Sequence, residues 1–313
     1  MVQKLSRTIN GEVIRTLRLR SGERTIDKDE ECVHMRRRVD IPAVVPAAGL
    51  GTRMRKLCGE RPKELLPVGG LAAIEHSMVE ALDAGLSRVA VVVRPDKPLI
   101  EEYIAGQRPA TLGEWSYAGP PIDYRQRFEE ILFVVQPEAD GVADAIVRAR
   151  SALGAEAIAC LMPDNVAFAP RPSIAACLDS YHATGLTTCA VVTVRSKDAY
   201  RFANCGGMEV WRRTDGRLAV TTLQDKGSGS FKVGPEGEAI RAIGRSVLAP
   251  RFFELLDEQG KPAADGEVDD VPLYQALAAA GEFLVAPIEG ECFDLGLPEG
   301  YEAALSYTAD HPA

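Results

Sequence analysis

The chain has 313 residues, is 46% hydrophobic and 26% charged, and has a formal net charge of −9. This composition is typical of a globular protein with one large α/β domain or two smaller ones, and the negative charge argues against general nucleic-acid binding. We find no apolar run of about 18 residues, so no membrane span is expected. The N-terminus has no signal-peptide core, and seven cysteines without a C-x-x-C pair favour reduced thiols. A cytoplasmic location is therefore expected.

Residues 1–40 are polar and dense in charge, and we expect an N-terminal extension of unknown role. They hold ten Lys/Arg against seven Asp/Glu, a net charge of +3. Apolar and polar residues alternate over 9–21, INGEVIRTLRLRS, which allows a short strand or hairpin. An extension that is solvated, or that contacts another copy in a homo-oligomer, is favoured over a basic arm for nucleic acid.

From residue 41 onward, apolar strand patterns alternate with amphipathic helix patterns. Strand patterns lie at 41–49, 88–95, 131–136, 157–165 and 187–194, and helix patterns at 72–86 and 141–153. This order predicts an α/β protein with a mixed, mostly parallel sheet, because strand–helix–strand units make right-handed crossovers. Ligands of such sheets bind beyond the carboxyl ends of the strands. We therefore expect the site in the loops that follow these strands.

The alternation becomes looser beyond about residue 200. Residues 206–227 predict a hairpin that turns at TDGR. Residues 227–239, GSGSFKVGPEGEA, predict a flexible loop that could close over a ligand. Further strand and helix patterns continue to residue 308 and leave a short tail, 309–313.

The segment AAGLGTRM, residues 47–54, directly follows the first predicted strand. Glycines let a backbone approach a triphosphate closely, and amide N–H groups can hold its oxygens. Arg53 adds a cation suited to phosphate, and Lys63 lies between two prolines in RPKELLPVGG. The alternative is a plain strand-to-helix turn followed by a solvent-exposed lysine, since the loop is neither a dinucleotide nor a Walker motif.

These two motifs resemble the signature of the bacterial UTP–glucose-1-phosphate uridylyltransferases, which are relatives of the glucose-1-phosphate thymidylyltransferases. The resemblance continues in order through VQPEADGVADAI, LMPDN, AIGRSVLAPRFFELLDE and CFDLGLPEGYEAAL, and spans residues 41–308. It implies a Rossmann-like nucleotidyltransferase fold with a small sugar-binding α/β insertion near 195–290. The implied reaction joins a nucleoside triphosphate, preferably UTP, to a sugar-1-phosphate and releases pyrophosphate.

The resemblance also implies a nucleotide site and two catalytic cations, Arg53 and Lys63, that face the phosphates. The implied nucleotide-binding residues are Ala48, Gly49, Gly51, Thr52, Gln136 and Gly141. An amide offers a donor and an acceptor, which suits the edge of uracil or thymine. Without the surrounding pattern, Gln136 would be interpreted as a surface glutamine at a strand end.

Asp164 and Asp294 each follow an apolar stretch at the end of a predicted strand. Alone, either could cap a helix or belong to a turn. Together they match the two aspartates that hold Mg²⁺ in the family that the sequence resembles. Magnesium often takes one or two carboxylates and completes its shell with phosphate oxygens and water. We therefore expect Mg²⁺ as the cofactor.

On the sugar side, the resemblance assigns Gly206, Asp225 and Lys226 to the sugar phosphate. Asp225 and Gly227 stand where the family has the glutamate and proline of a Glu-Lys-Pro motif. The shorter carboxylate predicts either a sugar that differs from glucose or a backbone that moves inward, which glycine would permit.

The predicted reaction needs no general base, because a phosphate oxygen of the sugar-1-phosphate is already an anionic nucleophile. Positioning and charge neutralisation by the metal, Arg53, Lys63 and Lys226 would supply the catalysis. One alternative is a thymidylyl- or purine-nucleotide transferase that acts on a modified sugar-1-phosphate, since GVADAI resembles a segment of adenylyl enzymes. The other is a catalytically weak sensor of nucleotide or sugar phosphate.

Overall fold

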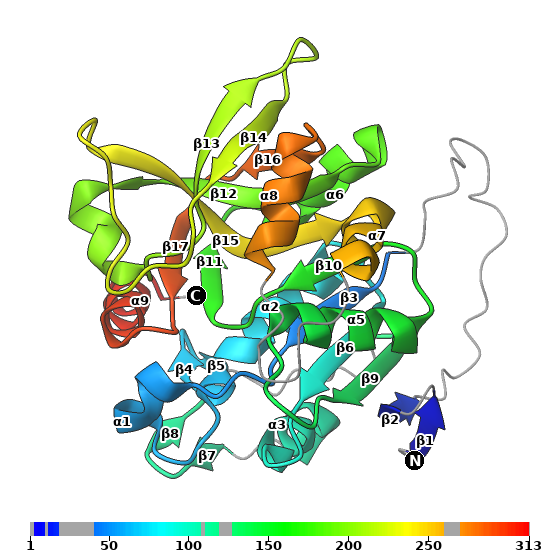
Figure 1. The fold of residues 1–313 in the computed structure, drawn as a ribbon. Coiled ribbons are helices and arrows are strands. Elements are labelled where there is room, and N and C mark those ends of the chain that lie inside the picture. The colour runs from blue at the N-terminus through cyan, green and yellow to red at the C-terminus, as the bar shows by residue number, and fades with distance from the viewer. Residues whose placement is uncertain are drawn as a thin grey trace, which may run out of the picture.

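A computed structural model describes residues 3–9, 12–18, 41–107, 110–118, 127–259 and 270–312. The described residues form an eleven-stranded mixed sheet, and helices cover both of its faces (Figure 1). In spatial order the strands are β1 (Gln3–Ile9), β2 (Glu12–Arg18), β9 (Glu130–Val135), β6 (Arg88–Val93), β3 (Ala43–Pro46), β10 (Ile158–Leu161), β15 (Glu238–Leu248), β12 (Thr187–Arg195), β16 (Phe283–Pro287), β14 (Leu218–Leu223) and β13 (Gly207–Arg212). None of the helices in the described ranges is long and apolar enough to cross a membrane.

Four neighbouring strands, β9, β6, β3 and β10, run parallel to one another. They are short, apolar and buried, as parallel strands covered on both faces are. Successive side chains point to opposite faces of the sheet. Val44 therefore packs in the core beneath α5 (Val142–Leu153), and Val45 packs in the core beneath α2 (Ala73–Asp83). This half of the sheet confirms the predicted α/β alternation.

The other half of the sheet is largely antiparallel. There β12 and β16 pair in parallel, whereas β10–β15, β15–β12, β16–β14 and β14–β13 are antiparallel. The prediction of a mixed sheet is confirmed, but the expectation of a mostly parallel one holds only for β9-β6-β3-β10. The cause is that residues 195–290, expected as a small insertion, add hairpin-connected strands to the same sheet. The predicted turn of the β13–β14 hairpin lies at 214–217.

Shorter elements complete the described fold. The remaining helices are α1 (Arg55–Cys58), α3 (Pro98–Glu102), α6 (Ser173–Thr184), α7 (Pro250–Gln259), α8 (Val271–Ala279) and α9 (Pro298–Asp310). Single turns of tighter or wider helix lie at Thr52–Met54, Lys63–Leu65, Tyr103–Gln107 and Ser196–Arg201. The two-stranded pairs are β4 (Pro67–Val68) with β5 (Leu71–Ala72), β7 (Thr111–Leu112) with β8 (Trp115–Ser116), and β11 (Asn165–Phe168) with β17 (Glu291–Asp294). The last pair sets Asn165 opposite Asp294, which brings two distant motifs together.

The N-terminal strands form a hairpin at one edge of the main sheet. The strand allowed by the alternation over 9–21 is present as β2, which pairs antiparallel with both β1 and β9. Ile14 is buried in the core, and Arg15 forms an ion pair with Glu101 at 2.7 Å. This part of the predicted extension therefore belongs to the main sheet. Residues 19–40 lie outside the described residues.

Ile14→Ala should lower the free energy of unfolding by about 2–4 kcal/mol, because it leaves a cavity in the core. Deleting residues 1–40 should also lower stability, since it exposes the edge of β9. Both changes should preserve kcat, because the recognised motifs lie beyond residue 40. Urea unfolding and steady-state kinetics would check this, with Val13→Ala, an exposed neighbour, as the control. Loss of turnover in a truncation that still folds would contradict the expectation.

Candidate active site

The glycine-rich loop begins where β3 ends, at the carboxyl edge of the parallel strands. Ala47 N–H donates to Val92 O at 2.8 Å, which ties the start of the loop to β6. Gly51 has φ +64°, a conformation that favours glycine, and from it the chain enters the turn Thr52–Met54. Among the described residues, the amide N–H groups of 48–51 have no hydrogen-bond acceptor. The loop therefore offers free donors to an anion.

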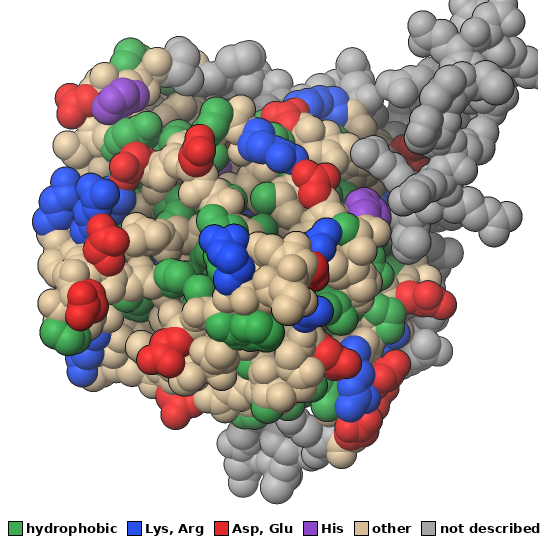
Figure 2. Space-filling view, turned by 90° about the horizontal axis from the view of Figure 1, so that it is seen from above, with side chains coloured by type: hydrophobic (Ala, Val, Ile, Leu, Met, Phe, Trp, Pro, Cys, Tyr) green, Lys and Arg blue, Asp and Glu red, His purple; other side chains and the backbone are tan. Residues whose placement is uncertain are grey.

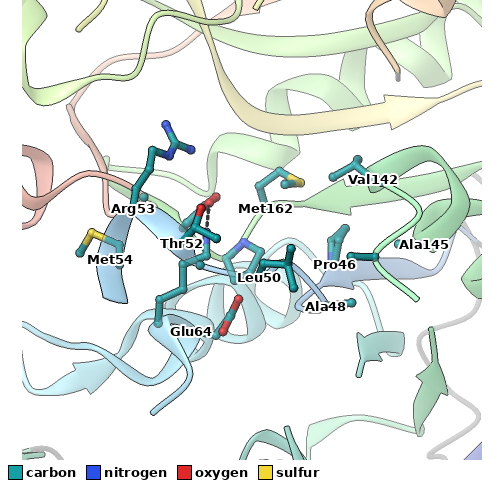
Figure 3. A pocket seen from close by; sticks show the side chains of 18 of the residues that line it. Pro46, Ala48, Leu50, Thr52, Arg53, Met54, Glu64, Val142, Ala145 and Met162 are labelled. Atoms are coloured by element: carbon teal, nitrogen blue, oxygen red, sulfur yellow. Dashed lines mark hydrogen bonds and ion pairs between the residues drawn. The ribbon is translucent and has the colours of Figure 1, made fainter. Parts of the chain in front are cut away.

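A cavity of about 350 Å³ lies beside this loop and collects residues from six segments of the chain. In Figure 3, Arg53 stands on one side of the cavity, while Val142, Ala145 and Met162 stand on another. Ten of the thirteen predicted site residues line it: Ala48, Gly49, Gly51, Thr52, Arg53, Lys63, Gln136, Gly141, Asp164 and Lys226. The structure thus brings together the predicted nucleotide residues, both predicted catalytic cations and one predicted metal ligand.

Gln136 directly follows β9 and is almost fully buried, with 2% of its surface exposed. Its Nε2 donates to Gly141 O at 3.0 Å and to Asp144 Oδ2 at 2.9 Å. These two bonds use both amide hydrogens and fix the orientation of the amide. Oε1 has no partner among the described residues, so the group that Gln136 presents to the cavity is an acceptor. This differs from the expected donor–acceptor pair.

Lys63 and Asp164 form a close ion pair, with Nζ 2.5 Å from Oδ2. Asn165 Nδ2 donates to Asp164 Oδ1 at 3.0 Å. Burial alone would raise the pKa of Asp164, but the charge and hydrogen bond of Lys63 outweigh it and lower that pKa to about 2. Burial would lower the pKa of Lys63, yet the carboxylate of Asp164 raises it above its ordinary value. Both groups therefore stay charged at neutral pH.

Asp294, at the end of β17, is buried and held by three donors. Ala203 N–H and Arg241 Nη2 each donate to Oδ2 at 3.0 Å, and Gly296 N–H donates to Oδ1 at 2.9 Å. Arg241 itself is 2% exposed. Removing one partner of a buried pair leaves an uncompensated charge. We therefore expect Asp294 to contribute to folding stability as well as to the site.

The two predicted metal ligands lie near each other beside Gly296. A Cβ on Gly296 would lie 2.9 Å from Asp294 Oδ1, 3.4 Å from Asp164 Oδ2 and 3.5 Å from Arg53 Nη2. Two neighbouring carboxylates suit a hard cation such as Mg²⁺. In the described ranges no three His, Cys, Asp or Glu side chains gather as a metal site. Substrate oxygens and water would therefore have to complete its coordination shell.

A second cavity, of about 270 Å³, continues from the first past Asp164 toward β13 and β14. Gly206, Lys226 and Asp294 line it, and Lys226 lines both cavities. Lys226 Nζ also lies 2.8 Å from Asp270 Oδ1, at the start of α8. The position and charge of Lys226 suit a phosphate that lies between the two cavities.

Asp225 is the one predicted site residue that lines neither cavity. Its Oδ1 accepts a hydrogen bond of 3.0 Å from Gln275 Nε2 on α8. The glycine that follows Lys226 has a structural cause, because Gly227 N–H donates to Asn204 O at 2.8 Å. Proline has no N–H to donate, and a Cβ at this position would clash with Asn204 Nδ2. The departure from the family motif therefore fits the local backbone.

Four residues of the site were not singled out in the sequence: Glu64, Lys97, Arg241 and Gly296. Glu64 and Gly296 lie within the recognised motifs, so their positions carried a signal. Lys97 and Arg241 lie outside those motifs, in the loop after β6 and in β15, and reach the site through the fold. Local sequence gave no sign of either role.

The surface carries both signs of charge. On the face in Figure 2, Lys/Arg and Asp/Glu side chains are interspersed. The formal net charge of the whole chain is −9. Phosphate groups would therefore be held by the few cations and free amides of the cavity, and not by a broad basic surface.

Solved structures with the same fold include a UTP-bound UGPase from Acinetobacter baumannii, with TM-score 0.67 and 23% identity, covering 87% of this chain and 94% of that one. A UDP-glucose pyrophosphorylase complexed with UDP-glucose also has TM-score 0.67 and 23% identity, covering 87% and 99%. At this identity the likeness concerns the fold alone, and it confirms the predicted nucleotidyltransferase architecture.

Curated relatives are more similar in sequence. The UTP–glucose-1-phosphate uridylyltransferase 2 of Staphylococcus saprophyticus is 27% identical over 264 residues, 83% of this chain and 88% of the relative. The UTP–glucose-1-phosphate uridylyltransferase of Staphylococcus epidermidis is 26% identical over 276 residues, 86% of this chain and 93% of the relative. Residues 42–304 match the Nucleotidyl transferase family as a whole. Since this match covers most of the chain, the chain belongs to the nucleotidyl transferase family.

Proposed function

We propose that this enzyme transfers a uridylyl group from UTP to a sugar-1-phosphate and releases pyrophosphate, with Mg²⁺ as its cofactor. The observation that carries the proposal is that Arg53, Asp164 and Asp294, from three distant segments, come together beside Gly296. Arg53 and Asp164 line both the cavity with free loop amides and the second cavity, and Lys226 also lines both. The names of the relatives support UTP and glucose-1-phosphate as the first substrates to test.

In this reaction a phosphate oxygen of the sugar-1-phosphate attacks the α-phosphorus of UTP in line. A new phosphorus–oxygen bond forms as the bond from the α-phosphorus to the bridging oxygen breaks, and pyrophosphate leaves with that electron pair. The loop amides and Arg53 would hold the triphosphate, and Lys226 would orient the sugar phosphate. Magnesium, held by Asp164 and Asp294, would neutralise charge on the phosphates. The nucleophile is already an anion, so no side chain has to remove a proton.

The test is a matrix of UTP, dTTP, CTP, ATP and GTP against a panel of sugar-1-phosphates, with pyrophosphate release as the readout. The expected result is release with UTP and at least one sugar-1-phosphate, dependent on Mg²⁺. Faster release with dTTP or a purine nucleotide would favour the transferase for a modified sugar. If the protein binds a nucleotide but releases no pyrophosphate with any pair of nucleotide and sugar-1-phosphate, the result would favour the sensor.

Asp225→Glu should raise kcat/KM for glucose-1-phosphate relative to the other sugar-1-phosphates by about tenfold, the effect of one hydrogen bond to a charged group. The reason is that the added methylene extends the carboxylate beyond its present bond to Gln275. Kinetics of both proteins on the full panel would measure the ratio, with Asp225→Asn as the control of equal length. The expectation would be contradicted if the wild type prefers glucose-1-phosphate and the Asp225→Glu variant loses activity on that substrate.

A further inference from the structure

Lys97 lies in the loop between β6 and α3 and contacts the glycine-rich loop from behind. Its Nζ donates to Gly49 O at 2.6 Å and to Ala47 O at 3.3 Å. It also lies 3.2 Å and 3.1 Å from the two carboxylate oxygens of Glu64. An ammonium group has three donors. Its hydrogens are therefore engaged by two loop carbonyls and one carboxylate, and the lysine is not itself free to hold a phosphate.

Glu64 completes a buried connection between three segments of the chain. Its carboxylate is 1% exposed, and the side chain of Lys97 is 13% exposed. Glu64 directly follows Lys63, whose methylene stem lies 3.6 Å from where a Cβ on Gly51 would be. The Lys97–Glu64 pair therefore links the loop after β6, the Pro-Lys-Glu motif and the glycine-rich loop.

The direction of the loop carbonyls determines the direction of its amides. No cis peptide bond occurs in the described chain, and in a planar trans peptide the C=O and the next N–H point in opposite directions. Because the carbonyls of Ala47 and Gly49 point at Lys97, the N–H groups of Ala48 and Leu50 point away from it. Both residues line the first cavity, and neither N–H has an acceptor among the described residues.

We propose that Lys97, held in place by Glu64, is a positioning residue that sets the free amides of the glycine-rich loop for binding a nucleoside triphosphate. The proposal rests on the proposed function, because it assigns the first cavity to the nucleotide. Lys97 acts through the backbone, so its loss weakens nucleotide binding more than it slows the chemical step. A lysine that only balanced the charge of Glu64 would affect stability and leave nucleotide affinity unchanged.

Three variants separate these roles. Lys97→Met removes the ammonium and leaves Glu64 buried without a partner. Lys97→Met with Glu64→Gln removes both charges and keeps the shape of the pair. Lys56→Met makes the same lysine-to-methionine change at an exposed position of α1. For each protein we would measure the Tm, the Kd for UTP by calorimetry, kcat and KM, and the hydrogen exchange of the amides of 48–50.

Lys97→Met is expected to raise the Kd and KM for UTP by about 10- to 100-fold, as misdirected hydrogen bonds to a charged ligand do, with a much smaller change in kcat. The loop amides should exchange faster, and Lys56→Met should behave as wild type. The double variant should recover the Tm and still bind UTP weakly. Either of two results would overturn the proposal. One is a double variant that recovers its affinity for UTP together with its Tm, and the other is a Lys97→Met variant that binds UTP as tightly as the wild type.

Calorimetry with UTP alone separates this proposal from the proposed reaction. A wild type that binds UTP but releases no pyrophosphate with any sugar-1-phosphate would refute the reaction, and the comparison of Kd values would still decide the role of Lys97. A wild type that binds no nucleoside triphosphate would refute both.

Discussion

Asp164→Asn and Asp294→Asn should each lower kcat by about 10³-fold or more, equivalent to roughly 4 kcal/mol in the activation barrier. Each change removes one of the two carboxylate charges that converge at Gly296, so the proposed Mg²⁺ loses half of its protein ligands. Pyrophosphate release measured across a range of Mg²⁺ concentrations would give kcat and the apparent metal affinity. Near-normal turnover of either variant in Mg²⁺ would remove that residue from the metal site.

The choice of asparagine follows from the surroundings of Asp294. Asp294→Ala would leave Arg241 buried and without its carboxylate, and a loss of folding would then be confused with a loss of metal. Asparagine keeps an oxygen that can accept from Ala203 N–H. Thermal unfolding of each variant would show how much of the loss is structural. Asp96→Asn, which alters an exposed ion pair with Arg94, provides the control and should change neither kcat nor Tm appreciably.

UTP or dTTP should exceed ATP and GTP in kcat/KM by at least about 10²-fold, because a wrong base leaves buried polar groups unpaired. CTP should also have a low kcat/KM. Oε1 of Gln136 is an acceptor, since its Nε2 already serves Gly141 and Asp144. Uracil and thymine present N3–H as a donor, whereas N3 of cytosine is an acceptor and would oppose Oε1. Competition kinetics with the five nucleotides would measure these ratios.

Gln136→Ala should shrink the preference for UTP over the other nucleotides, because the acceptor is lost while the rest of the cavity remains. Gln275→Ala disturbs the loop near Asp225 on the sugar side, so it should leave the ratios between bases unchanged. Faster turnover of ATP or GTP than UTP in the wild type would contradict the assignment of Gln136 as the base-reading residue.

The sequence by itself determined the parts of this protein that depend on short-range pattern. The loop at 47–54 was predictable because glycine conformation and the end of a buried strand are local properties, and the structure places it beside the cavity. Asp164 and Asp294 were singled out because a carboxylate directly after an apolar stretch is unusual. In the structure Asp294 ends β17, whereas Asp164 lies between β10 and β11. Their convergence depends on β11 pairing with β17, more than a hundred residues away in the chain. The resemblance implied that the two aspartates come together, but it did not predict the strand pairing that brings this about.

The tertiary structure decided what depends on distant partners. Arg241 and Lys97 became part of the site because β15 and the loop after β6 carry them there, and neither lies in a motif. The side-chain amide hydrogens of Gln136 donate to other groups of the protein, among them Asp144, and no local sequence pattern reveals this. Strand direction in the second half of the sheet, and the joining of β2 to β9, were also fixed by pairing between distant segments. The physical reason is common to all of these: hydrogen bonds and buried ion pairs form between groups that the chain brings together only when it folds.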